Sequence, residues 1–478
     1  MINIEDFVLE REYFLSGKVN EECGVFGVYN ITDKAAASLS YFGLHALQHR
    51  GQEAAGIAAS DNKHIECYKG KGLLTEIFNN QIIDDLGGKH SIGHVRYSTA
   101  GGNEIENVQP IMVRAHMGSF AVVHNGNIVN AKEIKIKLEK EGSIFQGSSD
   151  SEIIAHLIQK ESGTFVEKIM KAADHLEGAF AFIIMTKDCM YGIRDKNGLR
   201  PLSIGSLDDG YCMSSETCAM DIVNAKFMKD IEPGEVVRIA SDGVKYFHYT
   251  DKIQKKMCAM EYIYFSRPDS NIEGINVHTA RRISGQVLAQ EDGDSIQADI
   301  VVGVPDSSLS AAIGYSEKSG LPYEIGLIKN RYVGRTFIQP TQKQRERGVR
   351  MKLSAVTSIV KGKRIIMVDD SIVRGTTSKR IVQLLKEAGA LEVHVRIGSP
   401  AITHPCFYGV DTSTYDELIS SRLNVEELRN FIGADSLKFL SIESMSKAFN
   451  TTDLCVSCFS GQYPTNLYSL AKILKRED

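Results

Sequence analysis

The chain has 478 residues, too many for one hydrophobic core, so the sequence predicts two or three domains. Apolar residues make up 43% and charged residues 24%, which is ordinary for a globular protein and excludes a largely disordered chain or one built of membrane spans. The net charge of -5 excludes a general attraction to nucleic acid or anionic lipid, so we expect neither as a partner, and any phosphate site must be built locally.

The first 22 residues, MINIEDFVLEREYFLSGKVNEE, are acidic and contain neither a basic start nor an apolar run. A secretory signal needs both features, so we expect none here and expect a cytoplasmic protein. The chain has nine cysteines. Because the cytosol keeps thiols reduced, we interpret them as candidate nucleophiles or metal ligands and not as a disulfide framework.

From residue 23 to about 246, short apolar runs alternate with glycine-rich turns, and helical patterns intervene near residues 35–47, 131–140 and 151–160. This pattern predicts a mixed α+β domain with extensive antiparallel sheet. Four segments carry polar groups at the end of an apolar run, where a ligand can be held. They are LHALQHRGQEAAGIA (44–58), GHVRYSTAGG (93–102), HNGNIVN (124–130) and SSDSEII (148–154).

In this order, and with Cys23 opening the run CGVFGVYN, the four segments resemble the glutaminase half of the class II glutamine amidotransferases. The resemblance implies the αββα sandwich of the N-terminal-nucleophile family. In that family a mature N-terminal cysteine attacks the glutamine amide, and its own α-amine is the base. Cys23 is encoded inside the chain, so the resemblance implies that residues 1–22 are a propeptide, removed autocatalytically to free an amine that titrates near physiological pH.

The resemblance also implies roles for single residues. Cys23 is expected to be the nucleophile, and Asn125 with the Gly126 N–H is expected to form the oxyanion hole. The glutamine contacts expected are Arg96 to the α-carboxylate, Asp150 to the α-ammonium group, and Thr99 and Arg50 as weaker candidates in the same pocket. Taken singly, Cys23 is also compatible with a buried strand cysteine, and Arg96 and Asp150 with a solvated ion pair.

The pattern changes after the lysine-rich stretch 251–256, which we interpret as the crossing between two domains, 23–256 and 257–478. Beyond it, strand, loop and helix alternate, with strands expected in ADIVVGVPDSS, KRIIMVDDS and EVHVRIGSP. This order of elements predicts a doubly wound α/β fold with a parallel sheet for the second domain.

The run RIIMVDDSIVRGTT (364–377) is the most informative part of the second domain. Its apolar start predicts a buried strand, and Asp369 and Asp370 stand at the carboxyl end, where α/β sheets bind ligands. The loop 371–377 supplies hydroxyls and backbone N–H groups at the start of the next helix, a nest suited to a phosphate monoester. Two carboxylates beside such a nest favour ribose hydroxyls and a divalent metal as partners. A capping and turn device without a ligand is the alternative.

Along its whole length this run resembles the signature with which type I phosphoribosyltransferases bind phosphoribosyl pyrophosphate (PRPP). The resemblance implies one Mg²⁺ per subunit, held by Ser307, Asp369 and Asp370, with the two carboxylates also on the ribose diol. It implies a 5-phosphate site made of Ser371, Gly375, Thr376 and Thr377, and pyrophosphate contacts from Lys329, Arg331 and Arg335. The last three belong to KNRYVGRTFIQP (329–340), which we interpret as a flap over an anion, although an ordinary solvated loop is the alternative.

Four cysteines of the second domain come from three places: Cys258 at the crossing, Cys406 in THPCF, and the C-x-x-C pair Cys455 and Cys458. By count they suit zinc or an iron–sulfur cluster equally, and four unrelated buried cysteines are the alternative. The segments resemble the cluster-bearing class of glutamine PRPP amidotransferases, which implies one structural 4Fe-4S cluster per subunit. The remaining thiols, Cys67, Cys189, Cys212 and Cys218, show no such grouping, and we assign them no role.

The resemblance to this family extends from residue 23 to about 464, with the motifs of both halves in family order. It implies a reaction in which glutamine, PRPP and water give 5-phosphoribosylamine, glutamate and pyrophosphate, at the entry to purine synthesis. It also implies an apolar ammonia passage between the sites, a homotetramer, and inhibition by purine nucleotides. Two alternatives stay open: another class II amidotransferase, such as a glucosamine-phosphate or asparagine synthetase, and a regulatory nucleotide-binding protein that has lost catalysis.

Overall fold

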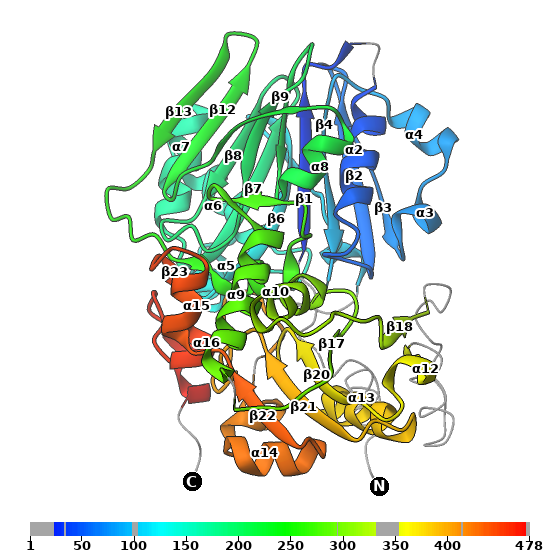
Figure 1. The fold of residues 1–478 in the computed structure, drawn as a ribbon. Helices are drawn as coiled ribbons and strands as arrows, with labels where there is room; N and C mark the ends of the chain where they lie inside the picture. Colours follow the sequence, from blue (N-terminus) through cyan, green and yellow to red (C-terminus); the bar gives the residue numbers. More distant parts are fainter. Residues whose placement is uncertain are drawn as a thin grey trace, which may run out of the picture.

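The structure is a computed structural model that describes residues 23–32, 35–97, 104–293, 295–330, 353–412 and 414–474. Residues 1–22, the predicted propeptide, lie outside this set, as do Thr99, Arg331 and Arg335. The described chain forms two halves, which Figure 1 shows one above the other. Two large facing sheets lie in the upper half, and a smaller sheet with helices around it lies in the lower half.

The first half contains, in its described residues, a seven-stranded and a six-stranded sheet whose strand pairings are antiparallel. In spatial order the first sheet is β11 (Lys226–Asp230), β9 (Ser203–Ser206), β10 (Tyr211–Ser214), β1 (Gly24–Tyr29), β4 (His90–Arg96), β2 (Ala54–Ser60) and β3 (Ile65–Lys71). The second is β13 (Gly243–His248), β12 (Glu235–Ala240), β8 (Met190–Arg194), β7 (Gly178–Thr186), β6 (Gly118–Ile128) and β5 (Ile111–Ala115). The antiparallel sheet predicted for this half is confirmed.

The two sheets pack face to face, and helices cover their outer sides. Val25, Ile92 and Val123 belong to the apolar layer between the sheets. Phe26 and Val28 on β1 point the opposite way, as the two-residue period of a strand requires, and pack under the helices. The first sheet is covered by α2 (Ala36–Ala46), α3 (Leu74–Ile77), α4 (Asn80–Leu86) and α8 (Thr217–Ile222), and the second by α5 (Ala131–Lys140), α6 (Glu152–Lys160) and α7 (Phe165–Asp174). The predicted αββα sandwich is confirmed.

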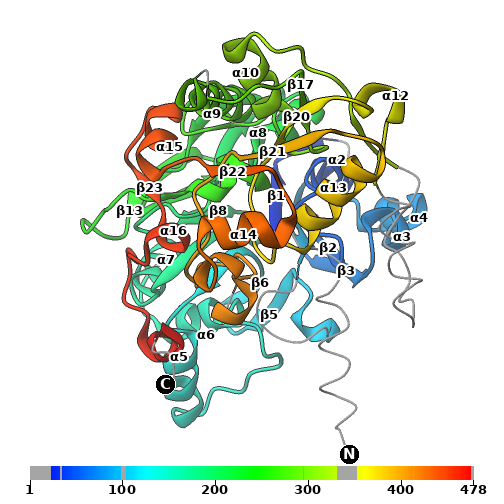
Figure 2. The ribbon, with the colours of Figure 1, turned by 60° about the horizontal axis from the view of Figure 1, so that its bottom comes forward.

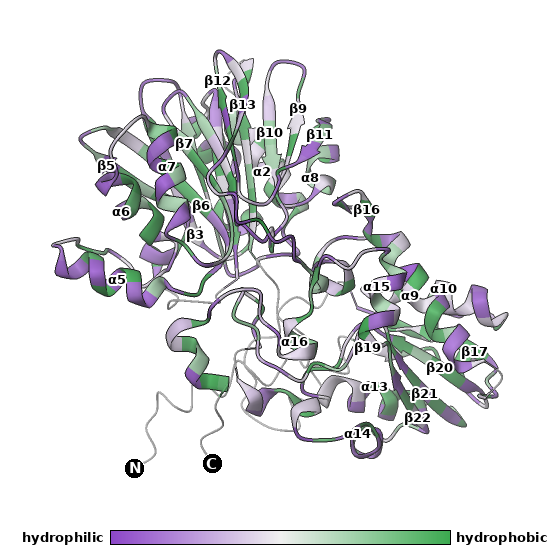
Figure 3. Ribbon diagram, turned by 90° about the vertical axis from the view of Figure 1, so that its left-hand side faces the viewer, coloured by the Kyte–Doolittle hydropathy of each residue, from purple (hydrophilic) through white to green (hydrophobic). Residues whose placement is uncertain are grey.

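The second half is built, within the described residues, on a four-stranded parallel sheet in the order β17 (Ile300–Gly303), β20 (Arg364–Asp369), β21 (Glu392–Ile397) and β22 (Ser436–Phe439). Ile366 and Val368 on β20 face one helical layer, and Ile365 and Met367 face the other. The first layer is α9 (Val277–Asp292), α10 (Leu309–Ser319) and α15 (Ile442–Ala448), and the second is α13 (Thr376–Glu387) and α14 (Val425–Ile432). Figure 3 shows the layers on either side of the sheet, so the predicted doubly wound fold is confirmed.

Short strand pairs and short helical turns complete the described elements. The C-terminal tail packs against the first half. The pairs are β14 (Met257–Cys258) with β23 (Leu454–Cys455), β15 (Asn271–Ile272) with β16 (Ile275–Asn276), and β18 (Leu327–Lys329) with β19 (Leu353–Ala355). The remaining short helical pieces are η3 (Ile105–Asn107), η4 (Glu261–Phe265), α12 (Thr357–Val360), η5 (Tyr415–Glu417), η6 (Ile419–Ser421), α16 (Ser457–Ser460) and η7 (Tyr468–Leu474). Leu467 packs with Val129 and Leu199, and the Ser469 N–H donates to Glu133 on α5 over 3.0 Å. Figure 2 shows this tail beside α5.

The placement of α13 on the sheet can be tested by mutation. Leu385 is fully buried, whereas Gln383 on the same helix is exposed. Leu385→Ala is expected to lower the free energy of unfolding by about 2 to 5 kcal/mol, because its neighbours refill the cavity only in part. Gln383→Ala is the control and is expected to change this free energy by less than about 0.5 kcal/mol. Urea unfolding followed by circular dichroism measures both, and equal effects would contradict the packing described here.

Candidate active sites and thiol cluster

Cys23 and Arg96 lie at the ends of two paired strands. β1 begins directly after Cys23, and Gly24 stands opposite Val95 in the antiparallel pairing of β1 with β4. This register places Cys23 beside Arg96, the last residue of β4. The Cys23 thiol is partly exposed and donates to the Tyr97 carbonyl over 3.4 Å, while Arg96 is buried. The strand pairing thus brings the expected nucleophile to the arginine expected to bind the glutamine carboxylate.

Asn125 and Gly126 lie near the end of β6 in the facing sheet. The sheets touch here, because His94 Nε2 on β4 lies 3.1 Å from the His124 carbonyl oxygen. The buried Asn125 amide nitrogen has no hydrogen-bond partner within the described chain, which points to a ligand oxygen as its partner. Gly126 has a φ of 138°, and a Cβ there would lie 2.1 Å from the Ala179 carbonyl oxygen, so only glycine fits.

Asp150 is fixed beside the same strand. Its Oδ2 accepts the Ile128 N–H over 2.9 Å, two residues beyond Gly126, and its Oδ1 lies 4.0 Å from His124 Nδ1. Its side chain remains 10% exposed, so a bound ammonium group could still reach a carboxylate oxygen. Cys23, Arg96, Asn125 and Gly126 therefore lie at or near strand ends at one end of the sandwich, and Asp150 comes from the turn before α6.

The sequence analysis missed a buried polar layer that holds β6 in place. Gln109 Oε1 accepts the His124 N–H over 2.6 Å, and Ser151 Oγ lies 2.8 Å from His124 Nδ1. Burial lowers the pKa of His124. Burial, followed by the charges of Arg96 and His124, lowers the pKa of His94 to about 3. Both imidazoles are therefore neutral at physiological pH. The histidine in HNGNIVN was the available signal, but its burial is a tertiary property.

Arg50 is fully buried and makes contacts that the sequence did not suggest. Its Nε donates to the Cys23 carbonyl over 3.1 Å. Its Nη1 donates to Glu216 over 2.7 Å, and Nη1 and Nη2 donate to Glu261 over 2.9 and 2.8 Å. These partners are 166 and 211 residues away in the sequence, so no local pattern pointed to them. Arg50 thus holds the backbone of Cys23, whereas the sequence suggested a contact to glutamine.

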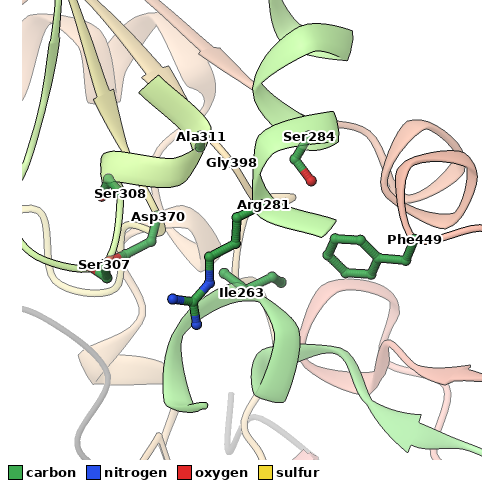
Figure 4. Close-up of a pocket in the computed structure, with 9 residues that line it drawn as sticks. All are labelled: Ile263, Arg281, Ser284, Ser307, Ser308, Ala311, Asp370, Gly398 and Phe449. Carbon is green, nitrogen blue, oxygen red and sulfur yellow. Dashed lines mark hydrogen bonds between the residues drawn. The ribbon is translucent and has the colours of Figure 1, made fainter. Parts of the chain in front are cut away.

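In the second half, Asp369 and Asp370 stand at the carboxyl end of β20 and are almost fully buried. Ser308 donates to Asp369 Oδ1 over 2.9 Å, and Ser371 donates to Asp370 Oδ1 over 3.0 Å. Ser307 donates to the other carboxylate oxygen of Asp370, and Figure 4 shows these two side chains together. The hydroxyl that the sequence associated with the metal is therefore adjacent to the carboxylates.

The turn after these carboxylates provides an anion site. Gly375 caps α13 with a φ of 72°, and a Cβ there would lie 3.0 Å from Ile419 and 3.2 Å from Phe431. Thr376 and Thr377 open the helix, so their backbone N–H groups have no partner within its first turn. These groups and the positive end of the helix dipole favour a bound phosphate.

The donor set at this sheet edge fits Mg²⁺. Asp369, Asp370 and Ser307 offer oxygen ligands, and Mg²⁺ commonly takes one or two carboxylates with water and substrate phosphates. In the described ranges no three His, Cys, Asp or Glu side chains form a metal-binding group by themselves. Lys329 on β18 is about half exposed and lies 3.0 Å from Asp306, while the other expected pyrophosphate ligands, Arg331 and Arg335, lie outside the described residues.

Three cysteines lie around Cys458 at the junction of the halves. The parallel pairing of β14 with β23 puts Cys258 opposite Cys455, and the Tyr408 N–H donates to Cys406 Sγ over 3.4 Å. Burial, followed by the charges of Cys406, Cys258 and Cys455, raises the pKa of Cys458 well above its ordinary value, so these three are its neighbours. Within the described chain they do not form a metal-binding group, but four neighbouring sulfur donors, of which Cys258 is buried and the others are partly buried, fit a thiolate-bound centre.

The four cysteines without an assigned role lie in the first half, apart from this cluster. They are Cys67, Cys189, Cys212 and Cys218. Burial is the largest cause of a raised pKa in each of them. Raised thiol pKa values are typical of cysteines that pack as small apolar residues and are unreactive, so the structure suggests no chemistry for these four.

Comparison with known proteins agrees with the two halves. Residues 94–221 match the glutamine amidotransferase domain family, and residues 275–397 match the phosphoribosyl transferase domain family. The first match contains the end of β4, all of β6 and Asp150, and the second contains β17, β20 and the turn at Gly375. Each family match therefore includes most of the candidate site residues of its half.

Relatives span nearly the whole chain. The amidophosphoribosyltransferase of Bacillus subtilis (strain 168) is 57% identical over 459 residues, which are 94% of this chain and 95% of the relative. A solved glutamine PRPP amidotransferase from B. subtilis, complexed with ADP and GMP, has a TM-score of 0.89 at 55% identity and covers 94% of this chain and 98% of its own. A solved allosteric regulatory enzyme of purine biosynthesis has a TM-score of 0.90 at 56% identity, over 94% and 97% of the two chains. The chain therefore belongs to the amidophosphoribosyltransferase family.

Proposed function

We propose that this chain carries out the reaction of its family, hydrolysing glutamine at one site and using the ammonia at the other to displace pyrophosphate from PRPP. The products are 5-phospho-β-D-ribosylamine, glutamate and pyrophosphate, in the first step of purine synthesis. One observation carries the proposal: a single chain joins a cysteine beside a buried, unpartnered amide donor to paired carboxylates followed by a phosphate nest, among the described residues.

In the first half, Cys23 becomes N-terminal when residues 1–22 are removed, and its α-amine takes the proton of the thiol. The sulfur then forms a bond to the glutamine amide carbon. Asn125 Nδ2 and the Gly126 N–H donate to the oxygen that becomes negative, and the buried, unpartnered amide of Asn125 supports this role. The C–N bond breaks, the leaving nitrogen takes the proton back from the α-ammonium group, and water hydrolyses the thioester to glutamate.

In this half, the proposed contacts pair each charged group of glutamine with a side chain of opposite charge. Arg96 binds the α-carboxylate of glutamine as a two-pronged donor, and Asp150 binds the α-ammonium group. Thr99 remains a proposed glutamine contact, although it lies outside the described residues. Arg50 was expected to belong to the glutamine contacts, and its bonds to Cys23, Glu216 and Glu261 favour a role in holding the nucleophile instead.

In the second half, Asp369 and Asp370 accept hydrogen bonds from the ribose hydroxyls, and the 5-phosphate lies in the turn made of Ser371, Gly375, Thr376 and Thr377. Ser307, Asp369 and Asp370 would hold Mg²⁺, which supplies positive charge for the pyrophosphate leaving group. Lys329 is a proposed contact to the pyrophosphate, as are Arg331 and Arg335, which lie outside the described residues. Ammonia forms the new C–N bond at the anomeric carbon as the C–O bond to pyrophosphate breaks.

The two halves must share ammonia without releasing it, since water would protonate it and remove its nucleophilic lone pair. An apolar passage between the sites meets this need. The cluster that joins Val129 and Leu199 of the first half to Phe407 of the second supports a water-poor junction. Ammonia would then reach the anomeric carbon unprotonated.

The thiol cluster has a structural role in this scheme. Cys258, Cys406, Cys455 and Cys458 would hold one 4Fe-4S cluster per subunit, and zinc suits the same donors by count. Burial raises the pKa of Cys406 to about 11, so a cation is needed to stabilise the thiolate form. A cluster here would tie the segment after the domain crossing to the C-terminal tail.

The remaining proposals concern partners, location and domains. We propose that the enzyme is a homotetramer and that purine nucleotides inhibit it. The ADP and GMP in the B. subtilis complex support the proposal of nucleotide inhibition. We also propose a cytoplasmic location. In the described ranges no helix has the length and apolar character needed to cross a membrane. The domain bounds proposed are a propeptide of residues 1–22, a glutaminase domain of 23–256 and a phosphoribosyltransferase domain of 257–478.

Replacement of the nucleophile tests the two-site scheme. Cys23→Ala is expected to lower glutamine-dependent pyrophosphate release from PRPP by about 1,000-fold or more, leave ammonia-dependent release unchanged, and keep residues 1–22 attached in the intact mass. Cys67→Ala, which removes a thiol without an assigned role, should change none of these. Wild-type enzyme that starts at Met1 and is fully active would contradict the maturation step, and an absence of PRPP-dependent release would contradict the function.

The PRPP site is tested by removing one carboxylate. Asp370→Asn is expected to lower kcat/KM for PRPP by about 100-fold, with either glutamine or ammonia as nitrogen source, because the acceptor for the ribose and the metal is lost. The control is Asp299→Asn, whose partner Arg364 lies at the other end of β20 and is partly exposed. Similar losses in the two variants would argue against a ligand at Asp370.

Metal analysis of anaerobically purified protein tests the thiol cluster. Wild type is expected to contain iron and sulfide and to absorb visible light. Cys455→Ser with Cys458→Ser should abolish the absorption and lower Tm, because the link between the crossing segment and the tail is lost. Cys189→Ser is the control and should keep both properties. Zinc without iron in the wild type would replace the cluster proposal by a zinc site.

A further inference from the structure

Arg50 joins the expected nucleophile to both halves of the molecule. Its Nε donates to the Cys23 carbonyl, and its terminal nitrogens donate to Glu216 and Glu261. Glu216 directly precedes α8 in the first half, while Glu261 begins the η4 turn of the second. None of the side chains of Arg50, Glu216 and Glu261 has exposed surface. The guanidinium that holds the nucleophile's backbone is therefore itself held by a residue of the other half.

Glu261 is surrounded by donors. Besides both terminal nitrogens of Arg50, it accepts a hydrogen bond from Ser266 Oγ over 2.7 Å and one from Arg200 Nη1 over 3.4 Å. Burial by itself raises the pKa of Glu261, but Arg50 and then Arg200 lower it to about 2, so the carboxylate is charged at physiological pH. A charged group bound from this many directions has a defined position, and a shift of that position also moves Arg50.

Arg281 on α9 ties the same turn to the candidate PRPP site. Its Nε donates to the Tyr262 carbonyl over 2.7 Å, and its Nη2 donates to the Ser266 carbonyl over 2.8 Å, so one guanidinium binds both ends of the turn. Arg281 also lines a small pocket together with Ser307 and Asp370, as Figure 4 shows. Among the charges near Arg281, that of Asp370 acts on it most strongly.

We propose that Glu261 is a positioning residue for the nucleophile Cys23, acting through Arg50, and that Arg281 couples its position to the occupancy of the site at Asp370. The inference rests on the proposed function. PRPP bound at Asp370 changes the charge that faces Arg281. Because Arg281 holds both ends of the turn, a shift of its guanidinium moves Glu261, then Arg50 and the Cys23 backbone. A displacement of about 1 Å or less is enough to change the rate of attack strongly.

A buried ion pair that only stabilises the fold makes a different prediction. Its loss would lower every activity of the enzyme together with Tm. A positioning role lowers the glutamine-dependent reaction selectively, since ammonia supplied in solution bypasses Cys23. Asp292 on α9 offers a matched control, because its carboxylate is paired with the buried Arg396 inside the second half. Loss of that pair should destabilise the protein without touching Arg50.

The test uses the full chain with PRPP, Mg²⁺ and either glutamine or ammonium chloride. Glu261→Gln is expected to lower kcat of the glutamine-dependent reaction at least about tenfold, while the ammonia-dependent reaction stays within about twofold. Asp292→Asn should lower Tm by a similar amount and leave the ratio of the two reactions unchanged. Glu261→Asp keeps the charge with a shorter reach, and its effect on kcat should lie between those of wild type and Glu261→Gln.

The coupling step is tested at Arg281 with saturating PRPP. Arg281→Met is expected to reduce the stimulation of glutamine hydrolysis by PRPP at least about fivefold, and Arg281→Lys should restore part of it. An unchanged ratio of glutamine-dependent to ammonia-dependent rates in Glu261→Gln would overturn the positioning role. Unchanged stimulation in Arg281→Met would overturn the coupling. Wild-type enzyme that makes no product from PRPP and ammonia would instead contradict the proposed function itself, so the two failures are distinguishable.

Discussion

The buried contacts of Arg50 determine how the two halves of the molecule sit against each other. The side chains of Arg50, Glu216 and Glu261 have no exposed surface, so each has lost its hydration, and their contacts with one another, together with those of Arg200 and Ser266 to Glu261, offset that loss. Separation or rotation of the halves would leave a charge unpaired in the interior. The same guanidinium also binds the Cys23 carbonyl. The position of Cys23 in the glutaminase pocket therefore depends on these buried contacts.

Both candidate sites lie where strands end, and the physical reason is the same in each half. Inside a sheet the backbone is fully paired and the side chains pack in apolar layers, so polar chemistry is confined to the edges. At the end of β20, the hydroxyls of Ser307 and Ser308 donate hydrogen bonds to the carboxylates of Asp370 and Asp369. Near the end of β6, the buried Asn125 amide nitrogen has no hydrogen-bond partner among the described residues.

The cysteine-bearing segment connects these edges to the C-terminal tail. The Asn127 side chain on β6 donates to the Phe407 carbonyl over 2.9 Å, directly after Cys406. A Cβ on Gly409 would lie 3.5 Å from the Gly126 backbone, so the segment packs closely against the strand expected to form the oxyanion hole. The cysteine-bearing segment is therefore adjacent to β6 as well as to the second half.

The sequence by itself determined the local elements and the residue types of the sites. The helices predicted near 131–140 and 151–160 are present as α5 and α6, and the strand before Asp369 is present as β20, because hydrophobic periodicity is a property of neighbouring residues. The family also followed from motif order. Only the tertiary structure decided the partners of Arg50, the burial of His124 and the neighbours of Cys458. These depend on contacts between residues far apart in the chain, where desolvation and packing set the energy and no local pattern records it.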